Sequence, residues 1–143
     1  MRFQGETFIL RKMVTPFKGG SGMKLFILLG AVNMILSIAL GAFGAHGLEG
    51  KVSERMLANW QTGAHYHMIH ALGLLFVGLL MGRISASSLL PVGGGLLLAG
   101  IVLFSGSLYV MALTNVKALG AITPVGGISF LIGWVLIAIA AMK

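Results

Sequence analysis

Apolar residues form four long continuous runs along this chain, at residues 25–43, 66–82, 89–113 and 122–142. Each run approaches the ~20 residues that an α-helix needs to cross about 30 Å of hydrocarbon. A bilayer offers no hydrogen-bond partners, so a spanning segment is a helix or part of a closed barrel, and unbroken runs favour helices. The pattern therefore predicts an all-α polytopic membrane protein with four transmembrane helices in an antiparallel bundle.

The longest connection, between the first two runs, contains a short amphipathic segment. Ser53 is a typical helix N-cap, and Glu54 places negative charge in the following turn. We expect a short interfacial helix here that runs into the second span, with Trp60 and Tyr66 at headgroup depth.

Residues 1–22 differ in character from the rest, because they are mixed, charged and interrupted by Pro16 and a glycine-rich stretch. Lys-Gly-Gly can be encoded by a ribosome-binding sequence, so we expect a disordered translated leader, with the true start at Met23 and the four-helix domain at residues 23–143. Alternatives are an artificial linker at residues 19–22, a mitochondrial presequence and a signal peptide cleaved near Gly44.

Composition supports a membrane protein and narrows its partners. The mean hydropathy is +1.00 and 9% of residues are charged, whereas soluble domains have about 25%. The net charge of +7 is scattered over loops and ends, without the basic stripe that nucleic-acid binding requires. We therefore expect a multi-pass protein of the cell (plasma) membrane whose first partner is the lipid bilayer, with no nucleic acid. Positive residues divide evenly between the two sides, which leaves the orientation open.

Small and polar residues recur every four positions on two spans, which places them on one helix face. Such stripes let transmembrane helices approach closely, and a buried amide can hydrogen-bond between helices. We expect packing seams there, with a ligand contact at the asparagine as the alternative; the residues are Asn33, Ser37, Gly41, Ala45, Gly78 and Gly82.

Two features mark the third and fourth spans. Glycines 93–95 indicate either close packing or a broken helix of the transporter kind. Thr123 and Pro124 read as the N-cap and first residue of the fourth helix.

All four histidines fall at one end of the predicted bundle, after span one and at the start of span two. The candidate functional cluster is His46, His67, His70, Tyr66, Trp60 and Thr62. Interfacial histidines bonded to backbone or lipid are the simplest reading, and a pH-sensing role is an alternative. A haem or metal held by His46 and His70 is another, although the spacing matches no metal motif. We therefore expect no cofactor and no metal.

Catalytic residues are scarce. The chain has no cysteine or aspartate, and beyond the first 22 residues its carboxylates are Glu49 and Glu54, both in the loop. No acidic residue lies in a span, which disfavours ion-coupled transport. Ser53 and Thr62 lie near histidines in the sequence, but their spacing does not indicate a catalytic nucleophile paired with a base. We expect that the protein is not an enzyme.

Two sequence blocks resemble a known family. Residues 41–48 (GAFGAHGL), followed by Trp60-Gln61-Thr62 and Tyr66-His67-x-x-His70-Ala71-Leu72, are similar to the bacterial membrane proteins grouped as domain of unknown function 423 and to eukaryotic transmembrane protein 256. The resemblance covers Met23–Lys143 and implies a multi-pass inner or plasma membrane protein, without an established activity. His67 stands where the family pattern has Gln. The positions that match are Gly41, Gly44, Ala45, His46, Gly47, Thr62, Tyr66, His70 and Ala71.

These observations favour a non-enzymatic accessory or assembly protein that acts through helix–helix contacts, either with a membrane protein partner or by self-association. The alternatives are an electron-transfer protein that uses His46 and His70, and a small-solute channel or carrier lined by Asn33, Ser37 and Tyr109.

Overall fold

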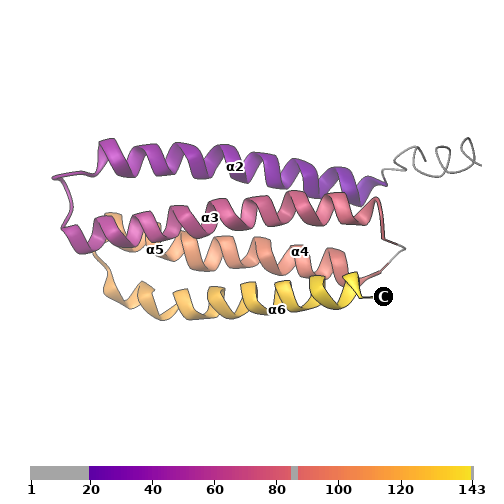
Figure 1. The fold of residues 1–143 in the computed structure, drawn as a ribbon. Helices are drawn as coiled ribbons and strands as arrows, with labels where there is room; N and C mark the ends of the chain where they lie inside the picture. Colours follow the sequence, from indigo (N-terminus) through magenta and orange to yellow (C-terminus); the bar gives the residue numbers. More distant parts are fainter. Residues whose placement is uncertain (1–19, 85–86, 143) are drawn as a thin grey trace, which may run out of the picture.

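The computed structural model describes residues 20–84 and 87–142, and nearly all of them are helical. The four candidate spans are α2, α3, the continuous segment α4–η1–α5, and η2–α6 (Figure 1). The predicted all-α, four-span architecture is confirmed. In chain order the elements are α2 (Ser21–Gly47), α3 (Glu54–Met81), α4 (Leu89–Gly100), the π-helix η1 (Ile101–Ser105), α5 (Gly106–Thr114), the 3-10 helix η2 (Lys117–Ala121) and α6 (Thr123–Ala141).

The predicted leader falls mainly outside the described residues, since residues 1–19 are not among them. α2 already begins at Ser21, and Gly22 lies beside Met81 at the far end of α3. The first span therefore extends beyond its predicted boundary near Leu25, and the leader stays a prediction.

The start of α3 corrects one expectation. The Ser53 hydroxyl accepts a hydrogen bond from the Met56 amide at 3.3 Å, so the predicted N-cap is confirmed. The helix that follows runs without interruption from Glu54 to Met81. A separate interfacial helix is not confirmed, because its residues are the first turns of the second span.

Turns between the spans depend on left-handed or capping residues. Gly50 has φ 72 in the α2–α3 connection, and Asn115 ends α5 with φ 57, a conformation that Gly and Asn adopt most readily. Thr123 is the first residue of α6 rather than its N-cap, and its hydroxyl pairs with Ser107 at 2.8 Å. Pro124 is therefore the second residue of α6 rather than the first, still within the first turn, where proline is tolerated.

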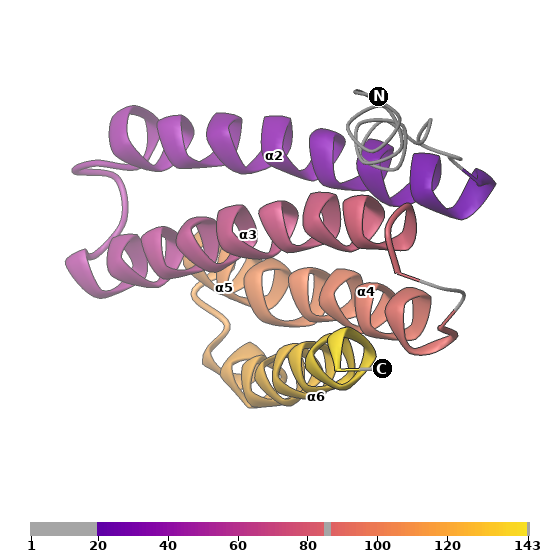
Figure 2. The ribbon, with the colours of Figure 1, turned by 45° about the vertical axis from the view of Figure 1, so that its right-hand side comes forward.

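The spans lie side by side in the order α2, α3, α4–α5, α6, and the stack does not close on itself (Figures 1 and 2). α2 packs mainly on α3, while α6 packs mainly on α4 and η1. In the apolar part of α2, 17% of the residues are buried inside the protein, whereas in the apolar part of α3 the share is 44%. α2 and α6 are thus edge helices of an open antiparallel bundle.

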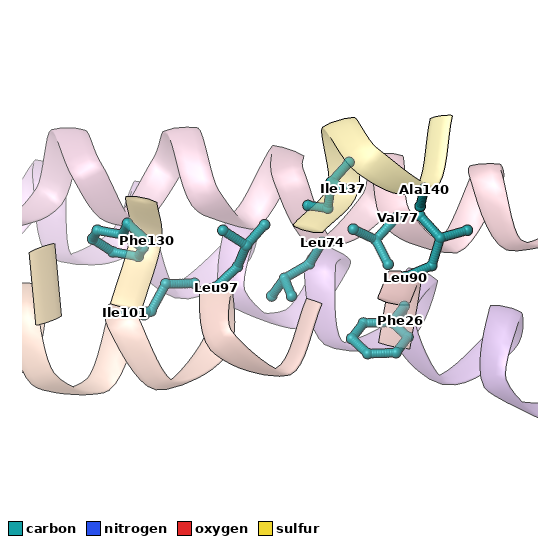
Figure 3. Packing of buried hydrophobic residues seen from close by; sticks show 9 residues of the cluster. All are labelled: Phe26, Leu74, Val77, Leu90, Leu97, Ile101, Phe130, Ile137 and Ala140. Carbon is teal, nitrogen blue, oxygen red and sulfur yellow. The ribbon is translucent and has the colours of Figure 1, made fainter. Parts of the chain in front are cut away.

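Buried apolar side chains from all four spans form the central core (Figure 3). They are Phe26, Leu74, Val77, Leu90, Leu97, Ile101, Phe130, Ile137 and Ala140. A second cluster, around Trp60 and Met111, joins the α2–α3 connection to α5.

Glycines set the closest approaches between the helices. A Cβ at Gly78 would lie 3.0 Å from the Ile27 amide nitrogen, and one at Gly93 would lie 3.0 Å from the Gly133 carbonyl oxygen. Glycines 93–95 lie within the helix α4, so the helix is not broken there, and Gly93 permits close packing against α6. The irregular turn of this span is η1, where a Cβ at Gly126 of α6 would clash with the Phe104 backbone.

We predict that Gly126→Ala destabilises the protein by about 1–3 kcal/mol, because the added methyl would push α6 away from η1. The neighbouring Gly127→Ala is a matched control, since its Cβ would lie 3.9 Å from Phe104 Cδ2, an ordinary contact. The measurement is the midpoint of SDS-induced unfolding in detergent, with circular dichroism as the signal. Equal midpoints for the two variants would contradict this account of the α6–η1 contact.

Candidate functional site

The structure separates the four histidines into two kinds. His46, in the last turn of α2, and His65 are exposed. His67 and His70 are buried on the inner face of α3, with 4% and 5% of their surfaces exposed. Only the two buried histidines therefore have the protein-defined surroundings that a site requires.

His67 joins three helices through both ring nitrogens. Its Nε2 lies 3.0 Å from Asn33 Oδ1 on α2, and its Nδ1 lies 3.3 Å from the Tyr109 hydroxyl on α5. The Asn33 amide nitrogen donates in turn to the Leu29 carbonyl at 2.8 Å. A buried polar side chain in a membrane protein is thus fully paired within the bundle.

The direction of each bond follows from its end groups. Asn33 uses its NH₂ group on the Leu29 carbonyl, so its Oδ1 can only accept, and His67 Nε2–H must donate. In the neutral ring Nδ1 then carries a lone pair, which accepts the Tyr109 O–H. The network is directed and closed, with no proton donor or acceptor of the His67 ring left over.

Trp60 extends this network toward the α2–α3 connection. Its indole Nε1–H donates to the Leu40 carbonyl at 2.8 Å, and its ring lies 4.6 Å from that of Tyr109. Gly44 makes room for the indole, because a Cβ there would clash with Trp60 Cδ1. The structure buries Trp60 among neighbouring helices, with 2% exposed, and its position at headgroup depth stays a prediction.

His70 has a different environment. Its Nδ1 lies 2.6 Å from the Tyr66 carbonyl, which can only accept, so Nδ1 carries the hydrogen. Its ring stacks on Phe130 of α6 with centroids 3.4 Å apart and planes 10° apart. His67 and His70 are thus opposite tautomers when neutral, and only His70 keeps its Nε2 without a partner among the described residues.

An aromatic groove of about 420 Å³ lies beside His70, between α3, η1 and the first turns of α6. Its walls include Tyr66, His70, Phe104, Phe130 and Trp134. The Tyr66 and Phe104 rings are 4.6 Å apart, and those of Phe104 and Phe130 are 5.6 Å apart. Sequence reasoning named Tyr66 and His70 but missed the walls from η1 and α6, because only the fold brings these spans together.

His46 and His70 are not brought together. Gly44 packs on Trp60, so His46 is level with the first turns of α3, whereas His70 lies ten residues beyond Trp60, about 15 Å along the helix. Two imidazoles that share a metal have nitrogens no more than about 4 Å apart. In the described parts of the chain no three His, Cys, Asp or Glu side chains are grouped as metal ligands would be. The pair therefore does not support the electron-transfer alternative.

The remaining predicted residues fall into distinct places. Ser37 is buried and donates to the Met34 carbonyl of its own helix. Gly78 packs on α2, and Gly82 caps the C-terminus of α3. Thr62 is exposed and its hydroxyl donates to the Ala58 carbonyl in its own helix.

Gly41 and Ala45 do not contribute to packing inside the described bundle. Ala45 is exposed, and a Cβ at Gly41 would meet nothing within 4 Å. The two residues, one turn apart on α2, leave a small-residue surface uncovered.

We predict that His67→Leu lowers stability by about 1–3 kcal/mol, because Asn33 and Tyr109 would lose their partner inside the bundle. His67→Gln should be milder, since an amide can donate to Asn33 and accept from Tyr109. SDS-induced unfolding of both variants measures the difference. If leucine were tolerated as well as glutamine, the bridge would not contribute to stability.

Comparison with known proteins places this chain in a family. The family described as Protein of unknown function (DUF423) matches residues 40–127. Over 121 residues, 85% of this chain and 98% of the relative, the chain is 54% identical to the UPF0382 membrane protein YwdK of Bacillus subtilis. The chain is 52% identical to the UPF0382 membrane protein SERP0230 of Staphylococcus epidermidis, again over 85% of this chain and 98% of the relative. No solved structure matches the chain. The chain therefore belongs to the DUF423 family, and its relatives are membrane proteins.

Proposed function

We propose that this protein is a non-enzymatic accessory protein of the plasma membrane, which binds another membrane protein through α2. The observation that carries the proposal is the open bundle, in which α2 packs mainly on one neighbour, α3. An edge helix of this kind leaves room for a transmembrane helix of a partner.

The uncovered residues on α2 are of the type that such contacts use. Lipid tails are as apolar as leucine side chains, so helices associate in membranes through close packing rather than through hydrophobic burial. Small residues one turn apart permit that approach, and Gly41 and Ala45 provide them on a flank of α2 that no other described residue covers. The other small residues, such as Gly30 and Gly78, already pack on neighbouring helices.

The pairing within the buried network weighs against a catalytic role for His67 and Trp60. Both nitrogens of His67 are bonded, and the Trp60 indole donates to a backbone carbonyl. General acid–base chemistry needs a group that can reach a substrate proton. The same pairing weighs against a channel, because Asn33, Ser37 and Tyr109 direct their polar atoms to partners within the protein.

A bulky substitution at Gly41 tests the partner contact. A Cβ at Gly41 would meet nothing within 4 Å, and the bulk of the Gly41→Leu side chain would block a partner helix. Gly95→Leu is a matched control, because a Cβ at Gly95 on α4 also meets nothing within 4 Å. We expect co-purification from native membranes in mild detergent, quantified by mass spectrometry, to recover a stoichiometric membrane protein with the wild type and Gly95→Leu. Recovery with Gly41→Leu should fall about tenfold, the effect of losing roughly 1.4 kcal/mol.

Two results would contradict the accessory role. Equal recovery of the partner with Gly41→Leu and the wild type would mean that this flank of α2 is not the contact. Recovery of this chain alone from wild-type membranes would point to a monomer or to self-association.

A further inference from the structure

The aromatic groove beside His70 has the dimensions and position of a binding site for a lipid-soluble molecule. Its volume of about 420 Å³ lies within the range of about 300–1,000 Å³ found for small-molecule sites. His70 lies about 24 Å along α3 from Glu54 and about 16 Å from Met81. Because Ile128 and Leu131 of the groove are exposed on α6, a ligand can enter from the hydrocarbon.

The groove opens at the molecular surface through residues of α6. Ile128 and Leu131, which line it, are 57% and 69% exposed, so they form a rim rather than a wall. Behind the rim lie the Phe130 and Trp134 side chains, and the Phe104 ring projects from the π-helix η1. Single π-helical turns inside α-helices often occur at functional sites.

His70 supplies a polar anchor that the protein itself leaves unused. The ring is 5% exposed, and its Nδ1–H is committed to the Tyr66 carbonyl. In the neutral ring Nε2 is therefore an acceptor only, and none of the described residues donates to it. An unpaired acceptor surrounded by apolar groups is unfavourable, so an occupant that donates a hydrogen bond would be stabilised here.

We propose that this groove binds an isoprenoid hydroquinone, with a ring hydroxyl donating to His70 Nε2 and the flat head group packed among the aromatic side chains. Aromatic rings prefer offset or edge contacts with other rings, which Tyr66, Phe104 and Trp134 offer. The isoprenoid tail extends past Ile128 and Leu131 into lipid. An acyl chain would fill the groove without any donor for Nε2.

The tautomer of His70 makes the proposal selective. A hydroquinone can donate to Nε2, whereas the oxidised quinone and the hydroquinone dimethyl ether have no O–H group. The Tyr66 hydroxyl on the groove wall both donates and accepts, so it does not distinguish the forms. The hydroquinone should bind about three- to tenfold more tightly than either analogue, the range expected for one hydrogen bond.

Fluorescence of Trp134 provides the measurement. The full chain in lipid nanodiscs is titrated, without oxygen, with decylhydroquinone, its dimethyl ether and decylquinone, and empty nanodiscs correct for partitioning. The chain has two tryptophans, and Trp60 lies outside the groove, so Trp134→Phe should lose the saturable quenching. We expect saturable quenching in the wild type, and the wild type should bind the hydroquinone with the highest affinity of the three ligands.

His70→Phe is the matched variant, because phenylalanine keeps a flat ring against Phe130 but lacks Nε2. Hydroquinone affinity should fall about three- to tenfold in this variant, and affinity for the dimethyl ether should stay the same, so the two ligands become equal. Equal affinities in the wild type, or a preference that persists in His70→Phe, would overturn the proposal. So would the absence of saturable binding, which is the result expected if lipid acyl chains alone occupy the groove. None of these results depends on α2, which does not line the groove.

Discussion

The absence of hydrogen-bond partners in hydrocarbon is the constraint on which this structure depends. Backbone groups meet it by forming helices, and polar side chains such as Asn33, Ser37 and Ser129 meet it by bonding within or between helices. His67 is the central case, since it links Asn33 on α2 to Tyr109 on α5. α2 otherwise packs mainly on α3, so this bridge helps hold an edge helix in register with the rest of the bundle.

The same constraint gives two neighbouring histidines different roles. His67 has a partner at each nitrogen, and its bonds are internal to the protein. His70 uses one nitrogen on the carbonyl of the preceding helical turn and presents the other where no described residue donates to it. The first arrangement stabilises the bundle, and the second leaves a hydrogen-bonding capacity that a ligand can use. The two histidines therefore differ in whether the second ring nitrogen has a partner within the described bundle.

Glycine also serves two purposes, according to which side of a helix it occupies. Gly78 and Gly126 face a neighbouring helix, where a methyl group would meet backbone atoms. Gly41 faces open space on α2, so a methyl group there would meet no other atom within 4 Å. Because helices in lipid associate through fit, the inner glycines determine the spacing of the bundle, and the outer one leaves a surface where a partner helix can approach.

The sequence by itself determined the number of spans and the Ser53 cap, because apolar length and capping are local properties. It did not determine how each helix is rotated, since lipid and protein interior are both apolar and the spans are apolar on all sides. Only the tertiary structure therefore buried Trp60, separated His46 from His70 and merged the expected interfacial helix with α3. The aromatic groove likewise depends on contacts between α3, η1 and α6, which are far apart in the chain and meet only when the helices pack.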